Sequence, residues 1–298
     1  MTPRAQIRML RDERRLHLHD GPIDLIVEAF GEIAQIDAAY NAACARFISV
    51  LDELCSELTF LRQQSCPETE WPQGSVARRM TAAVLPYASE YFITPMAAVA
   101  GAVAEEILAA MASAAHLPRA YVNDGGDIAL DLSEREKFVI GMVERPDRPS
   151  LFGTLTITAE DPIRGIATSG WRGRSLSLGI ANAVTVLADR AAAADAAATI
   201  IANAVDLPEH PAIVRVPACE LSPDSDLGSR LVTQAVGPLG VAEIDRALGS
   251  GVHTAERLLK LGLIRAAALN LCGETRLLGV HDSNLISRAV DERSLVHA

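Results

Sequence analysis

The stretch AAAADAAATII, from Ala191 to Ile201, sets seven alanines around one aspartate and one threonine. Alanine has the highest helix propensity of all residues, so the stretch predicts a helix with very small side chains. Asp195 and Thr199 are four positions apart, and both therefore point to the same side of that helix. The preceding segment AVTVLAD, residues 183–189, predicts a strand that leads directly into the helix.

The Asp195 and Thr199 side chains admit two interpretations. A carboxylate and a hydroxyl on one side of a helix can both reach a hard cation, and Mg²⁺ takes oxygen ligands that are completed by water and substrate phosphates. The small alanines would let a bulky phosphate approach. Alternatively, Asp195 complements the dipole of its own helix from the first turn, and Thr199 bonds back to a backbone carbonyl. The spacing alone leaves both interpretations open.

The overall composition is that of a globular protein. The chain has 298 residues, of which 49% are hydrophobic and 22% are charged. The formal net charge of −11 argues against nonspecific binding to nucleic acid and against docking on an anionic membrane. No signal-peptide pattern opens the chain, and no apolar run reaches the roughly 18 residues of a membrane span. Five scattered cysteines without a CxxC pair fit a reducing compartment, so we expect a cytoplasmic protein.

A long apolar stripe runs through the first quarter of the chain. Its residues recur at spacings of three and four, which predicts an amphipathic helix over about residues 36–64. The stripe consists of Ile36, Tyr40, Ala43, Phe47, Val50, Leu54, Leu58 and Leu61. Such a face packs on the rest of the chain or on a partner subunit, and we expect a homo-oligomer.

Another helix is predicted to begin at Thr94 and Pro95, because threonine is a good N-cap and proline suits the first helical position. It should end near His116, before Pro118. One face of this helix has almost no bulk, and it carries Thr94, Ala98, Gly101 and Glu105. Either another backbone or a ligand beside the helix N-terminus lies against that face.

Strand patterns make up much of the remaining chain. The segment AYVNDGGDIALDL, residues 120–132, predicts a hairpin around Asp124-Gly125, and Gly126 adds freedom at positive φ. A plain hairpin does not require Asn123 and Asp127 beside the glycines. Further strands are predicted at residues 16–20, 23–30, 137–144, 151–160, 163–170, 266–271 and 275–280.

Strands grouped with helices and joined by hairpin-length turns predict an α+β fold with antiparallel sheets. We expect a single domain over residues 1–298. In its C-terminal portion, about residues 206–298, two short helices at 241–248 and 253–262 are expected before the last strands.

No common nucleotide-binding or hydrolase motif is present, because the sequence lacks GxGxxG after a strand, GxxxxGK[ST], GxSxG and HExxH. His17 and His19 form an HxH pair on one side of a predicted strand. Such a pair can bind a metal, but it has no third ligand nearby, and we interpret it as facing solvent.

Three segments carry a family resemblance. MAAVAGAVAEE, VNDGGDI, and ATSGW followed by VTVLADRAAAADAAAT occur in the order and roughly the spacing of motifs in the ApbE family. That family comprises Mg²⁺-dependent FAD:protein FMN transferases. The whole chain, including GPIDLIVEAF and PDSDLGSRLVTQAVGPLG, is most similar to the UPF0280 family, a relative of ApbE. The UPF0280 resemblance covers most of the chain, whereas the ApbE-like motifs cover about residues 90–205. The resemblance implies an ApbE-like, T-fold-like arrangement of antiparallel sheets and helices.

The resemblance also implies a role for each matching position. It places Mg²⁺ on Asp195 and Thr199, and it makes Glu105 or Asp127 the base that deprotonates an acceptor hydroxyl. FAD, or another small flavin or nucleotide, is the implied ligand, and a protein is the implied acceptor of the FMN group. The implied contacts with that ligand are Thr94, Asn123, Gly125, Gly126, Thr168, Ser169 and Gly170.

Two departures from the ApbE pattern bear on the chemistry. Ala100 stands where the family has a lysine, and the family's His-Ile-Asp-Pro segment is absent between the TSG loop and the VTV strand. Arg172 or Arg174 could meet phosphates in place of the missing groups. Three functions therefore stay open: an FMN transferase, a non-catalytic flavin-, pterin- or nucleotide-binding protein, and an oligomeric structural protein.

Overall fold

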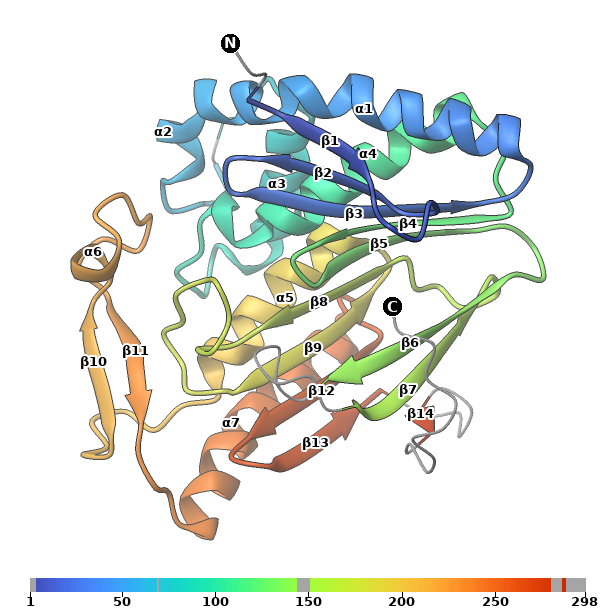
Figure 1. The fold of residues 1–298 in the computed structure, drawn as a ribbon. Coiled ribbons are helices and arrows are strands. Elements are labelled where there is room, and N and C mark those ends of the chain that lie inside the picture. The colour runs from blue at the N-terminus through green and yellow to red at the C-terminus, as the bar shows by residue number, and fades with distance from the viewer. Residues whose placement is uncertain (1–3, 69, 144–150, 280–285, 288–298) are drawn as a thin grey trace.

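A nine-stranded antiparallel sheet forms the centre of the fold (Figure 1). The computed structural model describes residues 4–68, 70–143, 151–279 and 286–287. Within them the strand order is β1-β2-β3-β4-β5-β8-β9-β12-β13. The bounds are β1 Gln6–Met9, β2 Leu16–Asp20, β3 Ile23–Phe30, β4 Arg119–Asp124, β5 Asp127–Leu132, β8 Gly165–Ser169, β9 Ala183–Ala188, β12 Ala266–Leu271 and β13 Glu274–Leu278. The predicted α+β fold with antiparallel sheets is confirmed.

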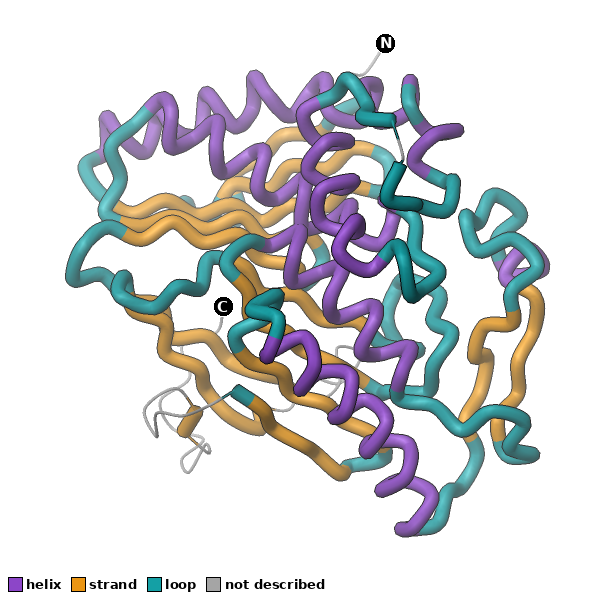
Figure 2. The backbone as a smooth tube through the Cα atoms, turned by 180° about the vertical axis from the view of Figure 1, so that it is seen from behind, coloured by secondary structure: helices purple, strands orange, loops and turns teal. Residues whose placement is uncertain are grey.

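Helices cover one face of this sheet (Figure 2). The longer ones are α1 Ile33–Ser56, α3 Ser75–Val84, α4 Val99–Ala114, α5 Ala191–Ala204 and α7 Val241–Lys260. Short pieces flank them, namely α2 Leu58–Leu61 and the 3₁₀ helices Leu85–Tyr87 and Pro95–Ala98. The main hydrophobic core lies between these helices and the sheet.

The other face of the sheet carries a smaller layer. Strands β6 Lys137–Val143, β7 Leu151–Thr158 and β14 Ile286–Ser287 form a three-stranded sheet, whose Phe138 and Leu155 belong to a second hydrophobic cluster with Leu130 and Ile166. A two-stranded ribbon of β10 Ile213–Pro217 and β11 Leu231–Val236, with α6 Ala218–Leu221 at its tip, stands to the side (Figure 1). On the helix-free face of the main sheet, the second cluster reaches Phe30 of β3 and Tyr121 of β4, which contact the Phe138 ring.

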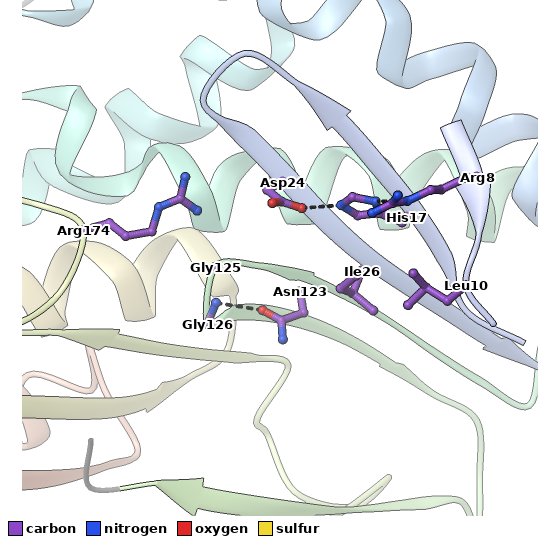
Figure 3. A pocket seen from close by; sticks show the side chains of 9 residues that line it. All are labelled: Arg8, Leu10, His17, Asp24, Ile26, Asn123, Gly125, Gly126 and Arg174. Atoms are coloured by element: carbon purple, nitrogen blue, oxygen red, sulfur yellow. Dashed lines mark hydrogen bonds and ion pairs between the residues drawn. The ribbon is translucent and has the colours of Figure 1, made fainter. Parts of the chain in front are cut away.

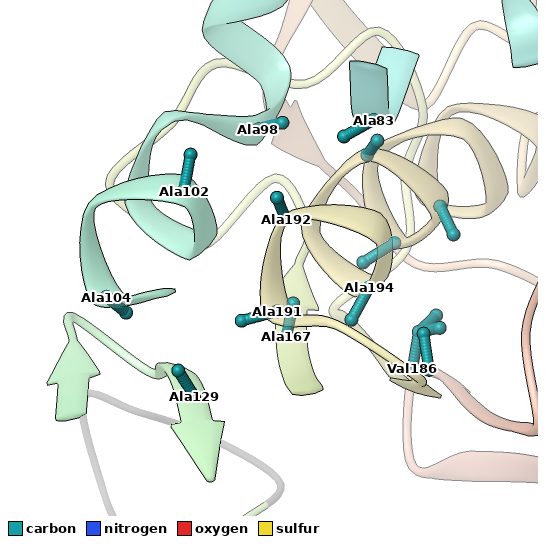
Figure 4. Packing of buried hydrophobic residues seen from close by; sticks show 14 of the residues in the cluster. Ala83, Ala98, Ala102, Ala104, Ala129, Ala167, Val186, Ala191, Ala192 and Ala194 are labelled. Atoms are coloured by element: carbon teal, nitrogen blue, oxygen red, sulfur yellow. The ribbon is translucent and has the colours of Figure 1, made fainter. Parts of the chain in front are cut away.

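The contact between α4 and α5 is made by backbones. A Cβ on Gly101 would lie 2.4 Å from the carbonyl oxygen of Ala191, and a Cβ on Gly165 of β8 would lie 2.1 Å from the carbonyl carbon of Arg190. Figure 4 shows small alanine side chains, among them Ala102 and Ala192, gathered where the two helices meet. Of the two interpretations of the small-residue face at 94–105, the one with another backbone against it is confirmed at Gly101.

The two predicted N-terminal helices are found with shifted ends. The amphipathic helix expected over 36–64 is α1, which begins at Ile33, and the short α2. The helix expected to begin at Thr94 starts as a 3₁₀ turn at Pro95 and continues as α4 to Ala114. The apolar stripe of α1 is buried in its own chain through Ala39, Tyr40, Ala43, Phe47, Val50 and Leu54.

The prediction of two short helices at 241–248 and 253–262 is wrong. The chain forms one helix, α7, through Gly249 and Gly251. A Cβ on Gly251 would lie 2.3 Å from a methyl group of Val205, so this glycine allows close packing instead of ending the helix. The strands β1, β10 and β11 and the helix α3 were not anticipated from the sequence.

One helical segment, Pro95–Ala114, is long and apolar enough to cross a membrane by length and composition alone. In this fold it packs against α1, α3, α5 and the sheet, and Val103, Ile107 and Met111 are fully buried. Its apolar character is therefore accounted for by its place in the core.

We predict that Gly101→Ala lowers the free energy of unfolding by about 3 kcal/mol, because the new methyl group overlaps the rigid backbone of α5. Urea denaturation measures this loss. Gly249→Ala is the matched control, since this glycine lies inside α7 with open space around it, and alanine there should stabilise the protein by about 0.5–1 kcal/mol. Equal effects of the two substitutions would contradict the proposed backbone contact.

Candidate functional site

The Asp195 carboxylate lies at the N-terminus of a different helix from its own. It sits in the second turn of α5, and its Oδ2 accepts a hydrogen bond from the Gly101 backbone N–H of α4 at 3.1 Å. The Ala100 N–H also points to it. Asp195 therefore complements the dipole of α4, and the simpler interpretation, in which it serves its own helix from the first turn, is wrong.

Glu105 makes the reciprocal contact. Its carboxylate accepts a hydrogen bond from the backbone N–H of Ala192, in the first turn of α5, at 2.7 Å. The Arg79 guanidinium lies 3.3 Å from the same carboxylate. Burial raises the pKa of Glu105, and the Ala192 amide and Arg79 oppose that rise. Each helix thus supplies a carboxylate to the free amides of the other.

The turn between β4 and β5 is a two-residue hairpin of Gly125 and Gly126, with φ angles of 63° and 115°. The Asn123 Oδ1 accepts a hydrogen bond from the Gly126 N–H at 2.8 Å, which stabilises the turn. The Asp127 Oδ1 accepts one from the Thr168 N–H at 3.1 Å and joins β5 to β8. Asn123 and Asp127 beside the glycines therefore have structural contacts in addition to any ligand role.

Three carboxylates share a negative region around this turn. Burial, followed by the charge of Asp127, raises the pKa of Asp195 well above its ordinary value. Burial raises the pKa of Asp127 to about 7. The pKa of Asp124 is also raised to about 7, by burial first and then by Asp127, while the Asp24 amide and Arg174 oppose the rise. The structure thus brings the predicted metal-binding aspartate close to the predicted glycine turn.

Thr199 and the residues of the predicted TSG loop differ in their contacts. The Thr199 hydroxyl makes no hydrogen bond with any residue that the structure describes, so it does not bond back to a carbonyl. Thr168 is exposed, and its hydroxyl bonds that of Thr185 at 2.9 Å. Ser169 is half-buried at the end of β8, and the Cβ of a larger residue at Gly170 would lie 2.5 Å from the Asn182 carbonyl oxygen.

The side chain of Thr94 contacts a different part of the chain from the glycine turn. Its side chain is buried and its hydroxyl donates a hydrogen bond to the Asp226 carboxylate, which comes from the loop between α6 and β11. Glu105 lines a separate hollow of about 250 Å³ together with Arg79, Arg164 and Arg190. Asp195 and Asp127 lie near each other beside the glycine turn. The hollow that Gly125 and Gly126 line is not lined by Glu105, Asp127, Asp195 or Thr199.

The donor set around Asp195 is made of hard oxygen atoms, which suit Mg²⁺. Within the described residues, no three histidine, cysteine, aspartate or glutamate side chains lie close enough together to bind a metal ion on their own. Mg²⁺ usually takes only one or two carboxylates and completes its six ligands with phosphate oxygens and water. Asp195 and Thr199 fit such a partial set, with one carboxylate oxygen engaged by the Gly101 amide.

The pocket beside the glycine turn contains groups that sequence reasoning missed (Figure 3). It has a volume of about 460 Å³ and lies on the helix-free face over β1–β4. Its lining residues are Arg8, Leu10, His17, Asp24, Ile26, Asn123, Gly125, Gly126 and Arg174. His17 is only 13% exposed and lies 2.6 Å from Asp24, so it does not simply face solvent. The short turn at Gly21-Pro22 sets His19 directly opposite Asp24, so His17 on the same side of the strand lies diagonal to Asp24. That register is the signal in the sequence that could have revealed Asp24 as the partner of His17.

Residues 7–277 match the family model described as "AbpE bacteria". The chain belongs to this family. A UPF0280 protein of Methanopyrus kandleri is 43% identical over 128 residues, which are 43% of this chain and 48% of that protein. A UPF0280 protein of Methanosarcina acetivorans is 33% identical over 187 residues, which are 61% of this chain and 70% of that protein.

The match to the Methanopyrus relative spans about half of that relative's length. Among solved structures, a mutant of the flavin transferase ApbE from Vibrio cholerae is similar with a TM-score of 0.46 and 12% identity, over 92% of this chain and 95% of that one. The resemblance to UPF0280 and ApbE-related proteins seen in the sequence is thus confirmed for this member of the AbpE bacteria family.

We predict that Asp124→Asn stabilises the protein more at pH 8 than at pH 5, by about 2 kcal/mol. The folded pKa of Asp124 is about 7, whereas an unfolded aspartate titrates near about 4. The stability that this group contributes is therefore fully present below about pH 4 and is lost as the pH rises through 7. Asparagine keeps an acceptor for the Asp24 amide but carries no charge.

Denaturation in urea at the two pH values, with EDTA present, measures the difference. Asp37→Asn controls for the loss of a single exposed carboxylate, since Asp37 is exposed on α1. A gain for Asp124→Asn that is the same at pH 5 and pH 8 would refute the raised pKa.

Proposed function

We propose that this chain is an ApbE-like, Mg²⁺-dependent protein that binds FAD or a related nucleotide and transfers FMN to an acceptor. The observation that carries the proposal is the Asp195 carboxylate, which has one oxygen on the Gly101 amide and lies near Asp127 beside the Gly125-Gly126 turn. These positions are also the ones that match the ApbE motifs in the sequence. A site rich in negative charge beside an open glycine turn suits a divalent cation with phosphates better than it suits a phosphate alone.

In this proposal Asp195 and Thr199 hold the cation. When bound, Mg²⁺ would neutralise the pyrophosphate of the ligand and stabilise charge on the leaving group. Gly126 has no heavy atom within 4 Å of the position a Cβ would take, so a ligand can approach its backbone. Arg174 lies over Gly125, where a Cβ would be 3.4 Å from its Nη1, and it can meet a phosphate oxygen.

Asp127 is the better base of the two candidates. Its pKa of about 7 leaves a large fraction able to accept a proton near neutral pH. Glu105 is held by both the Ala192 amide and Arg79, whereas Asp127 accepts one hydrogen bond, from the Thr168 amide. In the reaction, the acceptor oxygen would form a bond to the phosphorus of the FMN half of FAD. The bond to the AMP half would break, AMP would leave with the electron pair, and the acceptor proton would move to Asp127.

The second candidate is a flavin-, pterin- or nucleotide-binding protein without chemistry. Ala100 favours it, because this residue stands where the ApbE family has a lysine. The absent His-Ile-Asp-Pro segment favours it as well. The pocket and the acidic turn do not depend on either feature.

The localisation, the oligomeric state and the partners are part of the same proposal. We expect a cytoplasmic homo-oligomer with a protein acceptor, and no nucleic-acid or membrane partner. The third function, an oligomeric structural protein built on the stripe of α1, has less support, because that stripe is buried within the chain.

We expect the purified protein to release AMP from FAD in the presence of Mg²⁺, and Asp195→Asn to lower the rate by about 100-fold or more. Asparagine retains an oxygen that can accept the Gly101 N–H, so the fold should persist while the charge is lost. Chromatography of the nucleotides measures the rate. Asp37→Asn is the control variant, and circular dichroism checks that both variants are folded.

A rate that is unchanged in Asp195→Asn would defeat the role of this residue. If no AMP is released with any acceptor, titration calorimetry with FAD decides between the first two functions, since tight binding without turnover identifies the non-catalytic protein.

A further inference from the structure

The pocket on the helix-free face has two chemically different ends. In Figure 3, Arg174 and the Gly125-Gly126 turn lie on one side, and Arg8, Leu10 and Ile26 lie on the other. The volume of about 460 Å³ is within the range of small-molecule sites, which is about 300–1,000 Å³. The pocket is thus large enough for an elongated ligand with unlike ends.

Arg8 is fixed in place although it lies on an exposed edge strand. Its Nε donates a hydrogen bond to His17 Nδ1 at 2.9 Å, and His17 Nε2 lies 2.6 Å from Asp24 Oδ1. Arginine has only donors, so Nδ1 must accept and Nε2 must carry the proton that it donates to Asp24. His17 and Asp24 therefore hold the guanidinium in one orientation.

The Arg8 end offers donors beside an apolar surface. The Arg8 Nη groups have no partner among the described residues, whereas its Nε is bonded to His17. Leu10 and Ile26 line the pocket next to it. A planar guanidinium next to aliphatic side chains suits a flat ring that carries carbonyl or ring-nitrogen acceptors, which can stack or accept hydrogen bonds.

The opposite end offers charge and open backbone. Arg174 is exposed, and among the described residues its guanidinium makes only a 3.4 Å contact, with the Pro22 carbonyl oxygen. The Asn123 Oδ1 is bonded to the Gly126 N–H, which turns the acceptor of this amide away and leaves its NH₂ as a donor. Arg174 and the Asn123 NH₂ are donors beside a bare glycine turn, and they suit a phosphate that is accompanied by a cation, because the Asp24 and Asp124 carboxylates lie nearby.

We propose that this pocket orients a nucleotide, with its phosphate at Arg174 and the glycine turn and its ring against Leu10 and Ile26, where Arg8 recognises it. Arg8 is then a specificity-determining residue, and His17 and Asp24 are positioning residues that act through it. The inference rests on the proposed function for the class of ligand, a nucleotide, and it adds which residues read the ring and which hold the phosphate.

The test compares ligands with and without a ring. Dissociation constants are measured by calorimetry for FMN, AMP and ribose 5-phosphate on the full chain. Arg8→Gln should weaken whichever of FMN and AMP binds the wild type by about tenfold or more, which is the effect expected from losing a charged donor. It should leave ribose 5-phosphate within about twofold. Arg174→Gln should weaken all ligands that carry the phosphate.

The positioning role has its own readout. His17→Ala should weaken the binding of the ring-bearing ligand as Arg8→Gln does, because it releases the guanidinium. His17→Gln should recover part of the affinity, since the amide can accept from Arg8 and donate to Asp24. Arg265→Gln, which alters an exposed arginine that does not line the pocket, is the matched control.

Four results would overturn the proposal: no measurable binding of FMN or AMP, equal loss for ribose 5-phosphate and the ring-bearing ligand in Arg8→Gln, an unchanged affinity in Arg174→Gln, or no recovery in His17→Gln. The proposed transfer reaction fails separately. Binding that depends on Arg8 and Arg174 without AMP release from FAD removes only the reaction. AMP release that depends on Asp195 but not on Arg8, His17 or Arg174 removes only this assignment.

Discussion

The fold depends on a reciprocal contact between two helix N-termini. Each of α4 and α5 begins with backbone amides that have no partner in their own helix. Asp195 of α5 accepts from Gly101 of α4, and Glu105 of α4 accepts from Ala192 of α5. The contact requires the two backbones to lie almost in touch, which explains both the glycine at position 101 and the run of alanines. A larger side chain at the crossing would separate the carboxylates from their amides.

The same contact shapes the candidate site. Because α5 is held close to α4 and to Gly165 of β8, the Asp195 carboxylate reaches the region where β4 and β5 turn. There its charge meets those of Asp124 and Asp127. Like charges held together in a buried place favour protonation or a cation. The structural role of Asp195 and its proposed role in binding Mg²⁺ are therefore compatible, since a carboxylate has two oxygens and the Gly101 amide is bonded to one of them.

Much of the local structure followed from the sequence, whereas long-range relations did not. The hairpin over residues 120–132 and the small-residue face of α4 were predictable from neighbouring residues, although the turn is Gly125-Gly126 and not the predicted Asp124-Gly125. Gly249 and Gly251 suggested a break in α7, since sequence does not reveal that Val205 fills the space beside Gly251. The edge strand β1 is exposed along its whole length, and its four residues alternate polar and apolar over too short a run to predict a strand.

The contacts of the candidate site also separate into those that the sequence predicts and those that it does not. The relation of Asp195 to Thr199 comes from helix spacing, and its relation to the glycine turn came from the family motifs. The bond from Arg8 to His17 depends on β1 pairing with β2, which no local pattern announces. The Thr94–Asp226 contact joins segments 132 residues apart, and its signal lies in no single motif. Contacts between residues that are close in the sequence can therefore be predicted from one sequence, whereas contacts that depend on strand pairing or on distant segments cannot.

The reciprocal contact also has a consequence during synthesis. Gly101 and Asp195 are 94 residues apart, and Glu105 and Ala192 are 87 apart. At a translation rate of about 5–20 residues per second, α4 leaves the ribosome roughly 5–20 s before α5 can join it. During that time its apolar surface has no cover from α5 and its first amides have no carboxylate. Nascent chains of this protein therefore expose that surface until the alanine helix has emerged.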